Sequence, residues 1–321
     1  MLGTRRRARA YTRLLLLVSI LLTGCGQLVA VQGEAAPVPD LSGRPINVVA
    51  TVGMIADLVK NIGGERVNVI GLMGPGVDPH LYKATAGDVQ KLERADMIFY
   101  GGLELEGRMT DIFEKLAIRR PTVAVTDGVP RDRLREPPEF KGKYDPHIWF
   151  DVTLWQFAAK RVADELVRVD PGSAELYRRN LEAYNAELDE LHEYIKAQIA
   201  TIPEPSRVLI TAHDAFGYFG AQYGVEVQAL QGTSTATEAG AADVQSLAAF
   251  IAERNIKAMF VESSVPESTI KAVQAAVEAR GKQVNIGGQL FSDAMGQNGT
   301  PEGTYLGMVR HNVDTIVDAL K

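Results

Sequence analysis

Residues 171–203 read PGSAELYRRNLEAYNAELDELHEYIKAQIATIP and contain almost no helix breaker between the opening Pro-Gly and the closing proline. Apolar side chains recur in this run at spacings of three and four, which places them on one face of a helix. They are Leu181, Tyr184, Leu188, Leu191, Ile195 and Ile199. The Pro-Gly-Ser at 171–173 is a start signal and Pro203 is a stop signal. At 1.5 Å per residue, about 28 residues would form a rod of roughly 42 Å.

Short β-branched runs alternate with longer helical patterns on both sides of this helix. The runs predict strands at residues 46–52, 66–73, 95–100, 122–125, 207–211, 225–230, 258–261 and 283–286. The patterns between them predict helices at residues 55–62, 88–94, 109–116, 215–223, 241–253 and 267–279. Alternation of strands and helices favours parallel sheets covered by helices. We therefore expect an α/β fold whose two lobes are joined by the long helix.

The predicted domain boundaries follow from this pattern. An N-terminal lobe would span residues 45–170, the linker helix residues 171–203, and a C-terminal lobe residues 204–321. A helical link resists bending more than a glycine-rich hinge would, so we expect no large closure of the lobes.

The start of the chain is typical of a secretory signal. Five arginines precede the apolar run Leu14–Leu22, which is too short to span a bilayer, where about 20 residues are needed. The sequence Leu-Thr-Gly-Cys at 22–25 follows and resembles the bacterial lipobox. This resemblance implies cleavage of residues 1–24 and attachment of lipid to Cys25, the only cysteine. An ordinary signal peptide with an incidental cysteine is the alternative.

The charge of the chain argues against some partners. Removal of residues 1–24 takes away five arginines and no acidic residue, so the net charge falls from −6 to about −11. A chain with this charge is a poor ligand for nucleic acid or for an anionic membrane surface. Residues 25–44 lack apolar periodicity and contain two prolines, which predicts a flexible tether.

The tripeptide Asp-Pro-His occurs twice, at residues 78–80 and 145–147, in a chain with only five histidines. Proline stiffens each loop, and imidazole is the commonest metal ligand in proteins. His80 and His147 therefore suggest two ligands to one ion. Asp78 and Asp145 are candidates to hold the second ring nitrogen of each. The alternative is a pair of turns that the aspartates cap.

The other three histidines differ in their settings. His213 follows the apolar strand that begins VLIT, and in open α/β sheets ligands gather where strands end. It is a candidate ligand, although a histidine packed between strand and helix would have the same pattern. His192 and His311 lie off the apolar stripes of their helices, so both are predicted to be solvated.

Asp293 is the candidate for a fourth ligand. It lies in the loop LFSDAMG at residues 290–296, after the last predicted strand. An isolated aspartate in a loop is also a common helix cap, so its assignment depends on the other three residues. Three imidazoles and one carboxylate suit a divalent ion such as zinc or manganese.

Several stretches together resemble one known family, the metal-binding lipoproteins of bacterial ABC importers for zinc, manganese and iron. They are VDPHLYKATAGD, DPHIWFD, TAHDAFGYF, LQGTSTATEAG, FVESS, LFSDAMG and GTYLGMVRHN. The resemblance runs from the lipobox to the C-terminus. It implies two lobes, each with a four-stranded parallel sheet, that hold a metal in the cleft between them. The implied ligands are His80 and His147 from the N-terminal lobe and His213 and Asp293 from the C-terminal lobe.

The resemblance does not decide between zinc and manganese, and some members of the family carry iron. Many zinc-dedicated members carry a histidine-rich loop before the second ligand, whereas residues 131–144 contain no histidine. Many manganese members have glutamate at the third ligand position, where this chain has His213. A third imidazole suits zinc better than manganese.

The implied function is capture and delivery of an ion without a chemical reaction. The protein would be an extracytoplasmic monomer, anchored through Cys25 on the cell surface or the periplasmic side, that passes the ion to an ABC permease in the membrane. Because ligand imidazoles must be neutral, the affinity should fall below about pH 6.5. The metal-bound form is the one that the permease would favour.

Two other functions fit the sequence less well. An extracytoplasmic zinc hydrolase would normally keep an open water position beside three protein ligands. Four candidate ligands argue against it, and the sequence contains neither H-E-x-x-H nor G-x-S-x-G. An adhesin would not explain ligands that come from both lobes.

Overall fold

The structure is a computed structural model that describes residue 41 and residues 43–321. The predicted signal peptide, Cys25 and most of the predicted tether lie outside the described residues. The end of that tether needs a correction. Leu41 is buried, and the Arg44 guanidinium donates to both carboxylate oxygens of Asp96 at 2.6 and 2.7 Å. These contacts hold the chain against the folded part before residue 45.

The N-terminal half contains one parallel sheet, in the strand order β2-β1-β3-β4. Its strands are β1 (Ile46–Ala50), β2 (Val67–Gly71), β3 (Met97–Tyr100) and β4 (Thr122–Ala124). The helices that connect them are α2 (Gly53–Gly63), α3 (Ala86–Arg94) and α4 (Thr110–Ala117). All were predicted within a few residues. Because the strands are parallel, their carboxyl ends meet at one edge, where the loops toward the site begin.

Helix α5 (Val152–Val169) was not predicted. Asp151 caps it, because its Oδ1 accepts the Thr153 N–H at 2.8 Å. Valine, tryptophan and phenylalanine crowd its first turns and resemble a strand, whereas its buried residues recur with helical spacing. These buried residues include Leu154, Trp155, Ala158, Ala159, Val162 and Leu166. The cap followed by this spacing was the signal that could have identified the helix.

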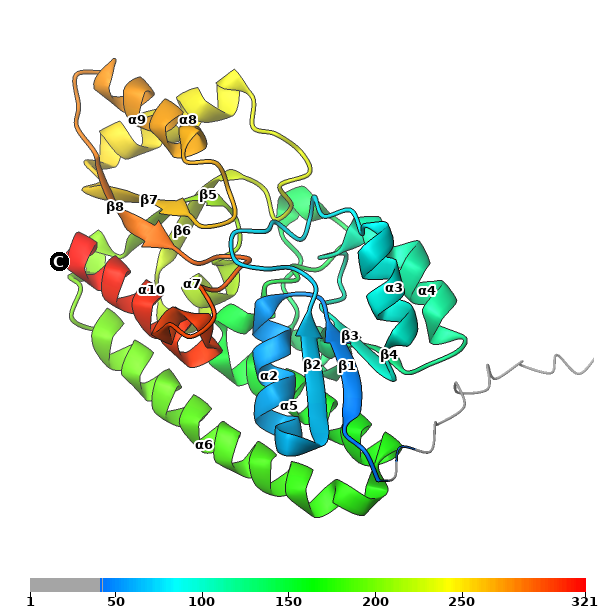
Figure 1. Cartoon of the computed structure of the whole chain (residues 1–321). Coiled ribbons are helices and arrows are strands. Elements are labelled where there is room, and N and C mark those ends of the chain that lie inside the picture. The colour runs from blue at the N-terminus through cyan, green and yellow to red at the C-terminus, as the bar shows by residue number, and fades with distance from the viewer. Residues whose placement is uncertain (1–40, 42) are drawn as a thin grey trace, which may run out of the picture. The chain divides into compact units, whose positions relative to one another are not determined.

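The predicted long helix is α6 (Ala174–Ile199), which has 26 residues. It packs against α2 and α5 of the N-terminal half and against α7 (Gly217–Tyr223) and α10 (Tyr305–Leu320) of the C-terminal half (Figure 1). Its predicted apolar face is buried except for Leu181, which is half-buried. The helix therefore braces both halves along one side.

The C-terminal half contains the four predicted strands, but their ladders form two parallel pairs, β5–β6 and β7–β8. The strands are β5 (Val208–His213), β6 (Glu226–Gln231), β7 (Ala258–Glu262) and β8 (Asn285–Leu290). Helices α8 (Ala241–Arg254) and α9 (Ser268–Glu278) complete this half. Strands β5 and β7 lie side by side. At the end of β5, however, the backbone N–H groups of Ala212 and His213 donate to the Glu262 carboxylate, which interrupts a regular ladder.

Strand β8 continues four residues beyond its predicted end. The prediction stopped before Gly287 and Gly288, because paired glycines usually break a strand. Here they let α10 approach the sheet. A Cβ on Gly287 would lie 2.7 Å from the Cβ of Ala319, and one on Gly288 would lie 2.6 Å from the Thr315 methyl group.

The core joins the two halves. One cluster of buried apolar residues includes side chains from β1 to α10, and a smaller cluster lies within residues 208–284. Tyr305, the first residue of α10, stacks on Trp155 with ring centroids 5.2 Å apart and donates its hydroxyl to the Trp149 carbonyl at 2.7 Å. Within residues 43–321, no helix combines the length and apolar character that crossing a membrane requires.

Candidate metal centre

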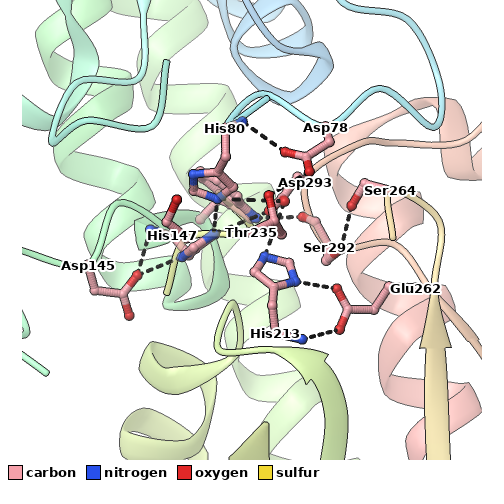
Figure 2. A network of polar contacts seen from close by, with 12 residues as sticks. Asp78, His80, Asp145, His147, His213, Thr235, Glu262, Ser264, Ser292 and Asp293 are labelled. Atoms are coloured by element: carbon pink, nitrogen blue, oxygen red, sulfur yellow. Dashed lines mark hydrogen bonds and ion pairs between the residues drawn. The ribbon is translucent and has the colours of Figure 1, made fainter. Parts of the chain in front are cut away.

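The structure brings the four candidate ligands together. One nitrogen or oxygen from each of His80, His147, His213 and Asp293 lies within 4.8 Å of all the others. The four residues are 5%, 0%, 0% and 1% exposed, respectively. Figure 2 shows them converging from four segments: the loop before α3, the loop before α5, the end of β5 and the loop after β8. Both halves of the chain contribute.

The two Asp-Pro-His tripeptides form the same local turn. Asp78 Oδ1 accepts the His80 backbone N–H at 2.8 Å, and Asp145 Oδ1 accepts the His147 backbone N–H at 2.9 Å. The turn that stood as the alternative to a ligand therefore exists in both places. It orients the imidazole that follows it, so the two interpretations are compatible.

The aspartates differ in what else they bind. Asp145 Oδ1 also accepts from Nδ1 of His147 at 2.7 Å, as predicted. Asp78 does not hold the His80 ring among the contacts of the described residues. Its Oδ2 instead accepts the Thr235 hydroxyl at 2.6 Å, from the C-terminal half. The candidate role of Asp78 as a ring acceptor was wrong: this carboxylate accepts from the His80 backbone N–H and the Thr235 hydroxyl.

His213 is held by a residue that the sequence pattern did not single out. Glu262 Oε2 lies 2.6 Å from Nδ1 of His213, while Oε1 accepts the backbone N–H groups of Ala212 and His213 at 2.7 and 3.0 Å. A carboxylate behind Nδ1 keeps the proton there and leaves Nε2 free for a metal. The available signal was the position of Glu262 at the end of a strand, within the FVESS stretch.

The inner nitrogen and oxygen atoms of the site face one another, but the Asp293 oxygens form no aligned hydrogen bond with the imidazoles. Asp293 Oδ1 lies 3.2 Å from His147 Nε2, and Oδ2 lies 3.2 Å from His213 Nε2 and 3.8 Å from His80 Nε2. Among the described residues, neither Asp293 oxygen nor the His213 Nε2 has a hydrogen-bond partner. Because its oxygens accept no hydrogen bond, the buried Asp293 carboxylate depends on the charge of the facing His147 and His213 rings. A cation held by all four side chains would supply this compensating charge instead.

Asp293 is positioned by its neighbours in the loop. The Trp149 indole N–H donates to the Ser292 carbonyl at 3.1 Å, and the Asn312 amide binds both backbone groups of Phe291 at 2.9 and 2.7 Å. Across the described part of the chain, no backbone N–H donates to the Asp293 side chain, so it does not serve as a helix cap. The loop thus aims a carboxylate at the three imidazoles.

The electrostatics separate the imidazoles into two kinds. Burial, with the neighbouring imidazoles, lowers the pKa of His80 to about 3 against the opposing effect of Asp293. Burial would also lower the pKa of His147, but Asp145 and Asp293 outweigh it and raise that pKa to about 9. Glu262 and Asp293 likewise outweigh burial at His213 and hold its pKa well above the ordinary value. Burial acts to raise the pKa of Asp293, yet His213 and His147 hold it well below the ordinary value.

The remaining histidines do not belong to this site, and they are only partly exposed to solvent. His192 is half-buried, with Nδ1 3.2 Å from the Tyr223 hydroxyl. His311 is also half-buried, with its ring centroid 5.0 Å from that of Phe291 and Nε2 3.1 Å from the Gln289 carbonyl oxygen. Tertiary packing supplies both partners, which the helical pattern cannot reveal.

The chain is similar over most of its length to metal-binding proteins. Residues 48–319 match the family described as zinc-uptake complex component A, periplasmic (ZnuA). The zinc-binding protein TroA of Treponema pallidum (strain Nichols) is 53% identical over 278 residues, which cover 87% of this chain and 89% of TroA. The manganese-binding lipoprotein MntA of Bacillus subtilis (strain 168) is 47% identical over 307 residues, which cover 95% and 97%.

A solved structure extends the similarity to three dimensions. The periplasmic zinc-binding protein TroA from Treponema pallidum superimposes with a TM-score of 0.84 at 52% identity, over 86% of this chain and 99% of that chain. The predicted α/β fold class is thereby confirmed.

Proposed function

We propose a function from the premise that this chain belongs to the zinc-uptake component A family, which confirms the resemblance that its motifs indicated. It is the substrate-binding protein of a bacterial ABC importer and captures a divalent transition metal for a permease. His80, His147, His213 and Asp293 would hold the ion. The observation that carries this assignment is the convergence of three imidazole Nε2 atoms on the fully buried carboxylate of Asp293, whose oxygens accept no hydrogen bond.

The proposed cargo is zinc or manganese. The relatives include a zinc-binding protein and a manganese-binding lipoprotein. Three imidazoles and a carboxylate accept either ion, with the third imidazole favouring zinc. The Nδ1 partners of His147 and His213 raise the basicity of both rings, which strengthens binding of either metal.

We propose that the chain is not an enzyme. A hydrolytic zinc site keeps a coordination position for water and room for a substrate beside it. The site here offers four protein ligands, and the most exposed of them, His80, is only 5% exposed. Full enclosure favours carriage of an ion over turnover of a substrate.

The cellular setting belongs to the same proposal. Cys25 would carry the lipid anchor, and the mature protein would act as a monomer outside the cytoplasm, beside its permease. The proposed lobes comprise residues 45–170 and 204–321, with residues 171–203 as the link between them. The cross-half core supports small rather than large movements of these lobes on release of the ion.

The test is elemental analysis of the purified protein followed by competition between zinc and manganese. We expect one ion per chain, lost in a His147→Ala variant and retained in a His192→Ala variant, which removes an imidazole away from the site. Undiminished binding in the His147→Ala variant would refute the site. Metal-dependent hydrolysis of an ester or phosphate would favour the enzyme instead.

A further inference from the structure

Arg135 lies between the loops that present two of the proposed ligands. Its Nη1 donates to Asp145 Oδ2 at 2.5 Å, and its Nη2 lies 3.5 Å from Asp214 Oδ2. Asp145 holds the ring of His147 through its other oxygen, and Asp214 directly follows His213 in the chain. One guanidinium thus contacts the residue that holds His147, in the N-terminal half, and the residue that follows His213, in the C-terminal half.

The backbone near Arg135 is tied to the same place. The Tyr218 hydroxyl accepts the Arg135 backbone N–H at 2.9 Å and donates to the Asp145 carbonyl at 3.0 Å. The guanidinium carbon lies 5.7 Å from the centre of the Tyr218 ring. Tyr218 belongs to α7 of the C-terminal half, whereas Arg135 and Asp145 precede α5 in the N-terminal half. The contacts therefore cross between the halves.

Gly217 makes room for the guanidinium. A Cβ placed on Gly217 would lie 1.4 Å from Nη1 of Arg135 and 2.1 Å from its Cζ. No side chain other than hydrogen fits there while the guanidinium keeps its position. Arginine suits this position because its planar guanidinium presents several N–H donors that can face two carboxylates at once, unlike the compact ammonium of lysine.

Loss of the contact between Arg135 and Asp145 would change how tightly the site holds its metal. The Asp145 side chain is fully buried, and its two oxygens are shared between Arg135 and His147. Removal of the guanidinium would leave a buried carboxylate oxygen without its cation, so Asp145 and the His147 loop would shift to find another partner. Groups that orient a ligand from behind typically change metal affinity by about 10- to 100-fold when they are mutated.

We propose that Arg135 is a positioning residue that ties the His147 loop to the His213 end of β5 and thereby slows the release of the bound metal. This role rests on the proposed function of the site. The two proposals predict different results. Without the Arg135 side chain, the ion would still bind to all four ligands, but its residence time would shorten.

The test measures the rate at which zinc-loaded protein gives up its ion to an excess of a chromophoric chelator. We expect Arg135→Ala to bind one zinc per chain and to release it about tenfold faster or more. Gly217→Ala should do the same, because the new methyl group displaces the guanidinium while leaving every charge in place. Arg133→Ala is the matched control, since this arginine of the same segment bonds Thr153 and should leave the rate unchanged.

The double variant separates positioning from general damage. If Gly217→Ala acts by displacing Arg135, adding it to Arg135→Ala should speed release no further. Multiplied effects of the two substitutions, or release at the wild-type rate from either single variant, would overturn the role of Arg135. If Arg135→Ala does not fold, the rate from Gly217→Ala alone decides. A wild-type protein that binds no zinc or manganese would instead refute the proposed function.

Discussion

Glu262, the last residue of β7, lies with Oε2 2.6 Å from Nδ1 of His213, the last residue of β5. Both side chains are fully enclosed. Parallel strands made this pairing possible, because they bring two chain segments 49 residues apart to the same edge. The carboxylate fixes which nitrogen of His213 faces the site.

Replacement of this carboxylate should weaken the site without removing a ligand. We expect Glu262→Gln to lower zinc affinity by about 10- to 100-fold, because an amide is a weaker acceptor for the imidazole N–H. Competition titration against a chelator would measure the change. Glu267→Gln is the control, since this glutamate pairs with Lys271 at the surface. Equal affinities for the wild type and Glu262→Gln would contradict the role of Glu262.

Metal binding should release protons near neutral pH. The pKa of His147 is raised to about 9 and that of His213 also lies well above its ordinary value. At pH 7 both rings therefore carry protons that the ion must displace, so affinity should rise with pH up to about 9 instead of levelling near 6.5. Calorimetry of zinc binding in buffers of different ionisation enthalpy counts these protons. Binding at pH 7 without proton release would refute the expectation.

The same pKa shifts make the metal-free protein sensitive to alkali. A histidine with a raised pKa in the folded state stabilises it fully below the unfolded pKa, about 6.5, and this contribution disappears as the pH passes the folded value. Between pH 6.5 and 9 the metal-free form should therefore lose stability as His147 loses its proton, and the raised pKa of His213 acts in the same direction. Thermal unfolding across this range is the measurement. Metal-loaded protein is the control, because its imidazoles are already neutral, and a flat profile for the metal-free form would contradict the assignment.

Helix α6 should tolerate truncation of a half-buried residue of its apolar face far better than truncation of a fully buried one. Leu188 is 0% exposed, whereas Leu181 is half-buried on the same helix. We expect Leu188→Ala to reduce the free energy of unfolding by about 2–5 kcal/mol, and Leu181→Ala by clearly less. Urea denaturation of the metal-free protein would compare them. Similar losses for the two variants would show that α6 is not held by the packing described.

Much of the fold could be predicted from local sequence patterns. The apolar spacing between Tyr184 and Ile199 predicted α6, and the alternation of strands and helices predicted the parallel sheets, because each pattern depends on residues within one or two turns. The local patterns gave wrong predictions where tertiary packing decided the secondary structure. Helix α5 starts with bulky residues that resemble a strand, and β8 continues through two glycines because α10 packs on them.

The candidate site divides in the same way. The sequence by itself determined which side chains could bind a metal: two stiff Asp-Pro-His turns, a histidine where a strand ends, and an aspartate in a loop. The Asp145 acceptor of His147 also followed from the sequence, but the tertiary structure alone decided the other partners of the ligand loops. Glu262 reaches His213 across 49 residues and Arg135 reaches Asp214 across 79, while Asp78 accepts from the Thr235 hydroxyl and does not hold the His80 ring as expected. A local pattern encodes the direction of the backbone, but a buried charge takes its partner from whichever segment the fold places within hydrogen-bonding distance.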